Sequence, residues 1–392
     1  MKTIDDDVLR FIMRTEMVSG DRVALTCAER VRLLGWKRAG IVIDALLLKN
    51  NPYAREVVDS LTAGLDSVVV VESTLPEPTY AYLDVVRKQL ADQVLECVIG
   101  IGGGSTMDLA KGLAVLQTNA GSAINFRGFD KVGVSPLPVV ALPSTAGTGS
   151  DVTPYAVFID TEARWKFGIN TEYNYPRLAL YDPRFLDSCP DHVYASSGMD
   201  AMTHALESFV ARSATPISRI FSIKAFELLY HYLRRVADGD RSTATKLNLL
   251  IGSGLAGVAL MNAGAGPAGA LSYPLGVFFE VPHGLAGSVF LPAVIEYNVR
   301  HKDCYEEYSI LADLIDPNAR ISAAEKSLRF AAAIRDLSAR LGIPTTLAGF
   351  GVKTDKDAQL IIGNSQQLKA AFDQNPVPFG VDAIRDTIHG LM

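Results

Sequence analysis

Cysteine is scarce in this 392-residue sequence, and the few thiols present are too far apart to act together. The four cysteines are Cys27, Cys97, Cys189 and Cys304, and no two of them have a C-x-x-C spacing. This arrangement contains neither a zinc ribbon nor a disulfide framework. We therefore expect four buried, reduced thiols.

Runs of basic residues are also absent. The chain has 37 lysines and arginines against 43 aspartates and glutamates, which gives a formal net charge of −6. An acidic chain without a basic cluster has no electrostatic attraction for nucleic acid. We expect a small-molecule substrate and no nucleic-acid partner.

A leader peptide and a membrane span are not evident either. Residues 1–14 read MKTIDDDVLRFIMR and carry acids where a signal peptide would carry a basic region followed by a long apolar one. We find no steadily apolar stretch of about 20 residues without a charge. The expectation is a soluble cytoplasmic protein with no membrane partner.

The residues that are present favour a globular α/β fold. Hydrophobic residues make up 48% of the chain, enough to build sizeable cores. Short apolar runs at 40–44, 67–72, 94–101 and 139–142 are typical of buried parallel strands. Because helical patterns separate them, we predict a parallel sheet covered by helices on both faces.

The pattern changes in the second half of the chain. Beyond about residue 191, helical periodicities follow one another without a β-branched strand run between them. They cover residues 195–211, 218–237, 242–260 and 323–341. We therefore predict an α/β domain over 1–185 and an all-α domain over 186–392.

A glycine-rich turn follows the third apolar run. Gly102, Gly103, Gly104 and Ser105 lie between a predicted strand and a predicted helix. Glycines let the backbone approach a ligand, and the N–H groups at a helix start favour a pyrophosphate. The usual G-x-G-x-x-G spacing is missing, and such turns also serve only to pack a helix on a sheet. Asp44, at the end of an earlier strand, suits a ribose 2′-hydroxyl or a helix cap.

Asp200 and His204 are a second candidate site. Four residues apart on a helix, their side chains lie on the same face, one turn from each other. A carboxylate and an imidazole in this arrangement can bind one divalent metal ion. They can equally form a simple hydrogen-bonded pair on a helix.

Four segments taken together resemble the iron-containing (group III) alcohol dehydrogenases. They are GGGSTMD at 102–108, STAGTGSDVT at 144–153, GMDAMTHALE at 198–207 and PHG at 282–284, in the order and spacing of that family. The resemblance implies a Rossmann-like, dehydroquinate synthase-like N-terminal domain and a helical C-terminal domain. It also implies a catalytic metal in the cleft between them and NAD(P)-dependent interconversion of an alcohol and a carbonyl.

The resemblance also implies a role for individual residues. Gly103, Gly104 and Ser105 would hold the pyrophosphate, and Asp44 falls where the family favours NAD over NADP. The residues implied around the nicotinamide and its ribose are Asp108, Thr145, Thr148, Ser150 and Lys166. The residues implied to hold iron or zinc are Asp200, His204 and His283. A homodimer is a further implication.

Two positions depart from the family pattern. Where the family has two histidines ahead of the Pro-His-Gly turn, this chain has Gly269 and Tyr273. Three protein ligands still suffice for a catalytic metal, and the glycine opens space beside it for water or for a bulkier, more polar substrate. Tyr273 either replaces the second histidine as a proton relay or only packs; near neutral pH a tyrosine is the poorer base.

These departures suggest a specialised branch of the family. The region is similar to the branch that oxidises the terminal hydroxyl of 3-deoxy-manno-octulosonate, an eight-carbon sugar acid. We expect metal-assisted hydride transfer from such an alcohol to NAD.

Three alternatives stay open at this point. One is a metal-independent dehydrogenase with Tyr273 and Lys166 as acid and base, and another is a non-catalytic NAD-binding protein. A dehydroquinate synthase-type cyclase would need a Lys/Arg cluster near the metal, and none occurs between 198 and 290.

Overall fold

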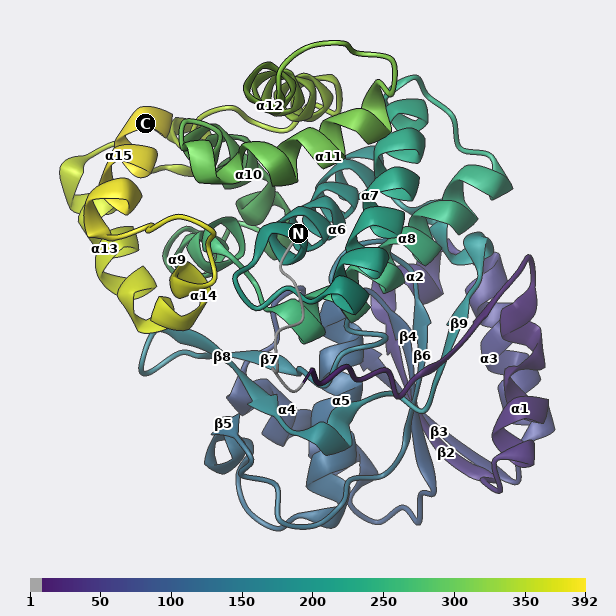
Figure 1. Ribbon diagram of the computed structural model, residues 1–392. Coiled ribbons are helices and arrows are strands. Elements are labelled where there is room, and N and C mark those ends of the chain that lie inside the picture. Colours follow the sequence, from purple (N-terminus) through teal and green to yellow (C-terminus); the bar gives the residue numbers. More distant parts are fainter. Residues whose placement is uncertain (1–8) are drawn as a thin grey trace. The chain divides into compact units, whose positions relative to one another are not determined.

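The structure is a computed structural model that describes residues 9–392, and it divides into two compact units (Figure 1). One unit contains residues 13–191 together with 241–254. The other contains the described residues up to Ile12, together with 192–240 and 255–392. The predicted division at residue 185 lies close to residue 191, where the long segment of the first unit ends. The prediction did not include the assignment of residues 241–254 to the first unit.

The first unit is built on a parallel six-stranded sheet, which confirms the predicted fold class. Its strands are β1 (Glu16–Ser19), β2 (Arg38–Asp44), β3 (Ser67–Ser73), β4 (Cys97–Gly102), β6 (Val139–Pro143) and β9 (Leu178–Tyr181). Their order across the sheet is β1-β9-β6-β4-β2-β3, and every neighbouring pair is parallel. Every residue of β4 and β6 is buried, as their continuous apolar runs predict.

Helices cover this sheet on both faces. In Figure 1, α1 (Cys27–Leu33) and α3 (Pro52–Gly64) lie on one side of it, and α4 (Tyr80–Arg87) and α5 (Gly104–Thr118) lie on the other. A short helix, α2 (Ala45–Asn50), follows β2 directly. The glycine turn therefore has the predicted position, between β4 and α5.

A smaller sheet lies beside the large one in the same unit. It consists of β5 (Gly128–Phe129), β8 (Trp165–Asn170) and β7 (Val157–Asp160). β7 and β8 form an antiparallel pair, and β5 adds to β8 in parallel.

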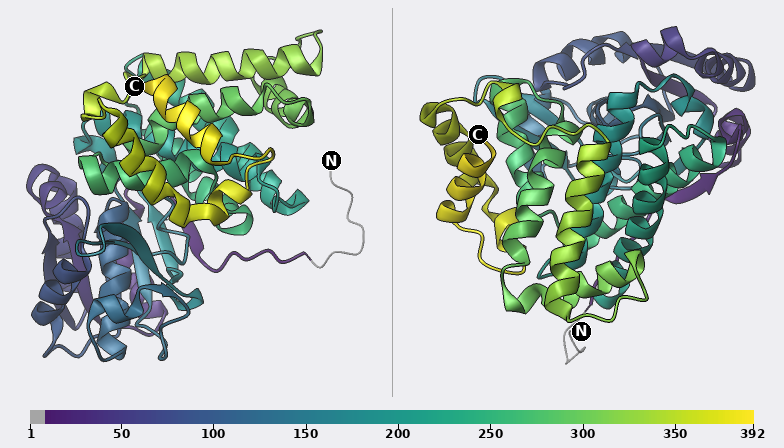
Figure 2. Two further views of the ribbon diagram at one scale, coloured as in Figure 1. Left: turned by 90° about the vertical axis from the view of Figure 1, so that its left-hand side faces the viewer. Right: turned by 90° about the horizontal axis from the view of Figure 1, so that it is seen from above.

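All strands of the described chain belong to the first unit, and the second is helical. Its helices are α6 (Asp191–Val210), α7 (Pro216–Ala237), the second half of α8 (Thr243–Ala263), α9 (Pro267–Phe279), α10 (His283–Asn298), α11 (Tyr305–Ile315), α12 (Ala323–Arg340), α13 (Asp355–Ser365), α14 (Lys369–Asp373) and α15 (Val381–Leu391). Figure 2 shows the part coloured from green to yellow as helices joined by loops. Capping boxes at Thr215, Ser322 and Thr354 begin three of them.

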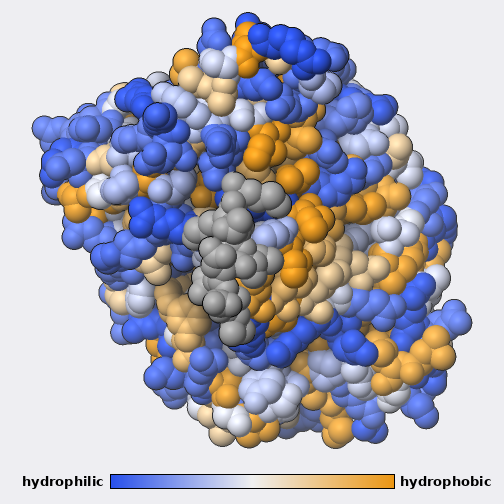
Figure 3. Space-filling model, viewed as in Figure 1, coloured by the Kyte–Doolittle hydropathy of each residue, from blue (hydrophilic) through white to orange (hydrophobic). Residues whose placement is uncertain are grey.

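One helix corrects an expectation from the sequence. Within the described residues, α8 is long and apolar enough to cross a membrane by length and composition, although 56% of its most apolar window is buried in the fold. The expectation that no such stretch exists was therefore too strict. Core helices meet the same criterion, and hydrophilic residues cover much of the face shown in Figure 3.

Candidate cofactor and metal sites

The three central strands bring the predicted cofactor residues to one edge of the sheet. β2 ends at Asp44, β4 at Gly102 and β6 at Pro143, and the carboxyl ends of parallel strands share an edge. From β2 the chain continues to β3 on one side, whereas β4 and β6 follow on the other side. Such a reversal of strand order is the usual place for a ligand in an open α/β sheet.

The glycine turn is packed too closely for side chains. A Cβ at Gly104 would lie 2.5 Å from the Thr148 side chain, and one at Gly102 would lie 2.7 Å from Thr106. The Ser144 N–H donates to the Gly102 carbonyl over 2.8 Å, which joins the glycine turn to the loop from 144 to 155. Since Gly103 is the N-cap of α5 and has no side chain to cap it, the helix start suits an anionic group.

Lys111 holds the loop from 144 to 155 in place. Its buried ammonium donates to Ser150 Oγ and to the carbonyls of Thr153 and Tyr155, each over 2.8 Å. Burial lowers the pKa of Lys111 to about 8, although Asp108 and Asp151 oppose this shift. The loop from 144 to 155 is thus fixed by a lysine that the sequence analysis did not assign.

Asp108 and Ser150 bond to each other. Ser150 Oγ donates to Asp108 Oδ1 over 2.6 Å, and the Val157 N–H donates to Asp108 Oδ2 over 3.0 Å. Burial raises the pKa of the Asp108 carboxyl, while nearby Lys111 counteracts that effect. The geometry gives Asp108 a structural role, and its contact with a cofactor stays a prediction.

The remaining predicted residues of this unit have partners of their own. Asp44 caps α2 by accepting the Leu47 N–H over 2.8 Å. Lys166 is almost buried and pairs with Glu77 over 2.5 Å. Ser105 Oγ donates to the carbonyl of Pro76. Thr148 Oγ1 accepts the Ser150 N–H over 3.2 Å, and the side chain of Thr145 lies against Gly103.

Helix α6 presents three polar side chains on one face. Asp200, His204 and Glu207 are four and three residues apart, which corresponds to two turns along one side of the helix. All three are buried, at 3%, 6% and 5% exposure. A buried carboxylate next to a buried imidazole requires a compensating partner.

His283 joins two of them to form a three-residue cluster. The Nε2 atoms of His204 and His283 lie 3.8 and 3.9 Å from Asp200 Oδ1. One ligand atom from each of the three residues lies within 4.8 Å of the others. Ligand atoms around a tetrahedral zinc are roughly 3.4 Å apart, since each bond is about 2.0–2.2 Å. The cluster therefore needs only a small contraction to hold such an ion.

Within the described residues, two of these side chains have a buried polar atom without a hydrogen-bond partner, which also fits a bound cation. Asp200 Oδ2 and His204 Nδ1 are buried and have no hydrogen-bond partner within residues 9–392. The ion pairs that Asp200 forms there are with the two histidines alone. A divalent cation would supply the missing charge and the missing partner of the carboxylate.

His283 is positioned by the start of α10. Pro282 is the N-cap of this helix, and Gly284 follows the histidine. A Cβ at Gly284 would lie 3.0 Å from the Ser196 carbonyl and 3.3 Å from the Asp200 Cβ, so the glycine allows α10 to pack closely on α6. Ser272 Oγ lies 3.0 Å from His283 Nδ1. The Pro-His-Gly motif thus brings its histidine to the Asp200 carboxylate.

Glu207 binds the start of α9. Its Oε1 accepts the Ala268 N–H over 2.7 Å, and its Oε2 accepts the N–H groups of Gly266 and Gly269 over 2.9 and 3.2 Å. Burial raises the pKa of the carboxyl to about 7, although these N–H groups act in the opposite direction. Glu207 lies outside the cluster of ligand atoms formed by Asp200, His204 and His283, so it does not replace the histidine missing at position 269.

Tyr273 lies against the metal-binding cluster. Its ring meets the His283 ring edge to face, with centroids 5.4 Å apart at an angle of 63°. The structure therefore brings Tyr273, Asp200, His204 and His283 together, as the motifs suggest. Whether its phenol transfers a proton stays a prediction.

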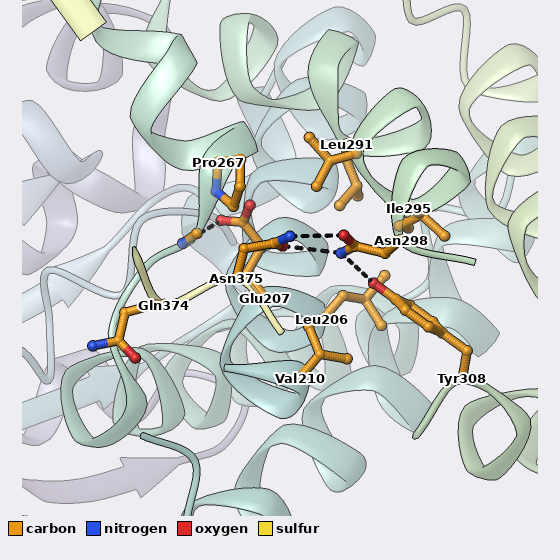
Figure 4. Close-up of a pocket in the computed structure, with 12 residues that line it drawn as sticks. Leu206, Glu207, Val210, Pro267, Leu291, Ile295, Asn298, Tyr308, Gln374 and Asn375 are labelled. Carbon is orange, nitrogen blue, oxygen red and sulfur yellow. Dashed lines mark hydrogen bonds between the residues drawn. The ribbon is translucent and has the colours of Figure 1, made fainter. Parts of the chain in front are cut away.

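Two cavities of the helical unit do not suit the chemistry. One, of about 10 Å³, lies between Glu207, Tyr308 and the hydrogen-bonded amides of Asn298 and Asn375 (Figure 4). It has room for about one water molecule. The other, of about 170 Å³, is apolar, and Arg219 is its one charged residue.

Three residues with a clear role were missed by sequence reasoning. The spacing of Glu207 from His204 is a usable signal, because it places the carboxyl on the face of the metal ligands. Lys111 follows Asp108 by three residues, which puts both on one face of α5. Ser272 carries no local signal, since its contact with His283 depends on how α9 and α10 pack.

Comparison with known proteins agrees with the fold and the motifs. The sequence-family model of the iron-containing alcohol dehydrogenases matches residues 14–183. The family model of their C-terminal domain matches residues 194–392. An NAD-dependent methanol dehydrogenase of Bacillus methanolicus is 32% identical, over 91% of this chain and 92% of its own. A 1,3-propanediol dehydrogenase of Citrobacter freundii is 33% identical, over 85% of this chain and 86% of its own.

Solved structures show the same likeness. The crystal structure of a 1,3-propanediol oxidoreductase has a TM-score of 0.92 and 27% identity, and covers 98% of this chain and 100% of its own. Both halves of the chain therefore match one family, in sequence and in fold. The chain belongs to the iron-containing alcohol dehydrogenase family and is an oxidoreductase that acts on alcohols.

Proposed function

We propose that the chain is an NAD-dependent, metal-assisted dehydrogenase that interconverts a polar primary alcohol and its aldehyde. The observation that carries this proposal is the convergence of Asp200, His204 and His283, where a buried oxygen of Asp200 has no hydrogen-bond partner in the described chain. In the oxidative direction, the alcohol and NAD⁺ give the aldehyde, NADH and a proton.

Asp200, His204 and His283 would hold iron or zinc. Such an ion, when bound, lowers the pKa of a substrate hydroxyl and polarises a carbonyl. The side chain of His283 is 21% exposed, against 8% for His204 and 4% for Asp200. Substrate would therefore approach from the side of His283.

NAD is the proposed cofactor because of Asp44. Asp44 Oδ1 caps α2, and we assign Oδ2 to the ribose 2′-hydroxyl. A carboxylate at the end of this strand would repel the 2′-phosphate of NADP. The relative from Bacillus methanolicus is named as NAD-dependent, which supports the same choice.

The substrate proposed is a polar primary alcohol such as the terminal hydroxyl of 3-deoxy-manno-octulosonate. Gly269 adds no side chain next to Glu207, which shares a face of α6 with Asp200 and His204, and Tyr273 adds a phenol next to His283. A wider and more polar site would favour a polyol or a sugar acid over a short apolar alcohol. Two relatives carry the names of primary-alcohol enzymes, for methanol and 1,3-propanediol.

A reconstitution assay tests the proposal. The purified chain is stripped of metal, reloaded with Zn²⁺ or with Fe²⁺ without oxygen, and assayed for NADH formation. Its substrates are 1-propanol, 1,3-propanediol, a polyol and 3-deoxy-manno-octulosonate, each with NAD⁺ or NADP⁺. We expect turnover by the loaded protein, with higher kcat/KM for NAD⁺ and for the polar alcohols.

The controls separate the alternatives. His283→Ala should abolish turnover, whereas the exposed His192→Ala should retain it. Equal turnover by the stripped and the loaded protein would instead favour the metal-independent dehydrogenase. No NADH from any alcohol with the loaded protein would contradict the proposal.

A further inference from the structure

Ser272 connects the backbone of α9 to the ring of His283. The serine is 1% exposed, and its Oγ lies 2.6 Å from the carbonyl oxygen of Gly269, one turn earlier on the same helix. The same Oγ lies 3.0 Å from His283 Nδ1. One hydroxyl thus takes part in two hydrogen bonds.

The chemistry of these groups fixes the direction of both bonds. A carbonyl oxygen only accepts, so the single proton of the hydroxyl is donated to Gly269. Toward His283 the serine therefore presents a lone pair. The bond to Nδ1 then requires that this nitrogen carries the ring proton.

This makes Nε2 the unprotonated nitrogen of the neutral imidazole. Nε2 is the atom that lies 3.9 Å from Asp200 Oδ1, on the side of the three-residue cluster. We propose that Ser272 is a positioning residue that holds His283 in the tautomer and orientation needed for metal binding. The inference rests on the proposed function only for the identity of the ligand as a metal ion.

The ring of His283 has a second contact with α9, and Ser309 offers a matched control for the loss of the Ser272 hydroxyl. The Tyr273 ring meets the His283 ring edge to face, so α9 contacts the imidazole through this ring as well as at Nδ1. Ser309 on α11 donates in the same way to the carbonyl of Glu306, three residues earlier, over 2.8 Å. Because no bond from the Ser309 hydroxyl to a histidine is present among residues 9–392, Ser309 is a matched control for the loss of such a helix bond.

The first experiment reads the tautomer without metal. Histidine-labelled ¹⁵N protein is stripped of metal and kept at pH 8, and the His283 ring signals are assigned by their loss in His283→Ala. We expect the proton on Nδ1 in the wild type and in Ser272→Thr, and a shift toward Nε2 in Ser272→Ala. A wild-type ring with its proton on Nε2, or unchanged ring signals in Ser272→Ala, would overturn the proposal.

The second experiment reads metal affinity. Zn²⁺ binding is measured by competition with a chromophoric chelator, together with the melting temperature of each metal-free variant. Loss of such a histidine partner weakens metal binding by about 10- to 100-fold. We expect that loss in Ser272→Ala, wild-type affinity in Ser309→Ala, and recovery in Ser272→Thr. A Ser272→Ala affinity within about twofold of wild type would overturn the proposal.

The two experiments fail independently of each other. If the wild type binds no Zn²⁺ and no Fe²⁺, the proposed metal-assisted function fails, while the ring spectra still test the serine. If the wild type binds metal and the ring spectra do not respond to Ser272→Ala, the proposed function stands and the role of Ser272 is wrong.

Discussion

The carboxyl group of Glu207 is buried in the helical unit, and burial raises its pKa to about 7 from 4.5. Between these two values the folded chain binds more protons than the unfolded chain. The contribution of Glu207 to the free energy of unfolding is therefore full below about pH 4.5, falls as the pH rises, and is lost above about pH 7. A shift of this size corresponds to about 3 kcal/mol.

Glu207→Gln removes this titration and leaves an amide N–H₂ facing backbone N–H groups of α9. We expect a loss of about 1–3 kcal/mol at pH 7, because a buried donor loses its acceptor. We also expect a weaker dependence of stability on pH than in the wild type. Urea-unfolding midpoints at pH 5, 6, 7 and 8 check both outcomes, with the exposed Glu306→Gln as control. Parallel pH curves for wild type and Glu207→Gln would refute the assignment.

The phenol of Tyr273 can be removed without losing its ring. Tyr273→Phe retains the edge-to-face contact with His283 and should leave metal content unchanged. If the phenol relays the substrate proton, kcat falls about 100-fold, and its pH profile changes. Steady-state kinetics with the loaded protein measure this effect. A kcat within twofold of wild type would mean that Tyr273 only packs.

The sequence predicted single residues well only where the signal was local. Asp200 and His204 share a helix, so their spacing alone placed them on one face. His283 lies 79 positions further along and came from the resemblance of its motif. The spacing of Glu207 from His204 places it on the same face of α6, but its bonds to α9 depend on helix packing. The contact of Ser272 with His283 depends on such packing as well, and no spacing in the sequence reports it.

At the level of elements, the turn between β4 and α5 leads to a sharp prediction. A Cβ at Gly104 would lie 2.5 Å from the Thr148 side chain and 2.9 Å from its Cβ, so one loop must move. Overpacking of this kind costs about 1–3 kcal/mol. We expect Gly104→Ala to weaken NAD⁺ binding at least tenfold, since the proposed pyrophosphate site is displaced.

Fluorescence titration of the purified protein measures this loss. Gly133→Ala is the matched control, because nothing lies within 4 Å of a Cβ at that position. The double variant Gly104→Ala, Thr148→Ala should regain part of the affinity, since it removes the two closest atoms of Thr148. NAD⁺ affinity of Gly104→Ala equal to that of the control would argue against this loop as the pyrophosphate site.

Elements with strong periodicity were predicted, and the rest were not. The apolar runs became β2, β3, β4 and β6, and the four long helical patterns became α6, α7, α8 and α12. Strand β1 has only four residues, too few for a pattern. Helices α9 and α10 contain Pro274 and Pro292, which normally argue against a helix interior. Tertiary packing stabilises both helices in spite of this cost.

For the whole molecule, alternation of strands and helices was enough to predict the fold class. It was harder to predict which residues make up each unit, because residues 241–254 belong with the sheet although they begin the long helix α8. Lys246 pairs there with Asp187 over 2.5 Å, and Gly254 leaves room for the hydroxyl of Tyr181. Contacts between residues so far apart in sequence leave no periodic signal. The homodimer and the cytoplasmic location stay predictions.

The central claim is that three side chains form a real metal site, and bound metal per chain tests it most directly. Wild type, His283→Ala and the control His192→Ala are stripped, reloaded with Zn²⁺ or with Fe²⁺ without oxygen, desalted and analysed for metal content. We predict about one ion per chain in the wild type and in His192→Ala, and a large loss in His283→Ala. Metal-free wild type after reloading, or equal metal content in His283→Ala, would contradict the account.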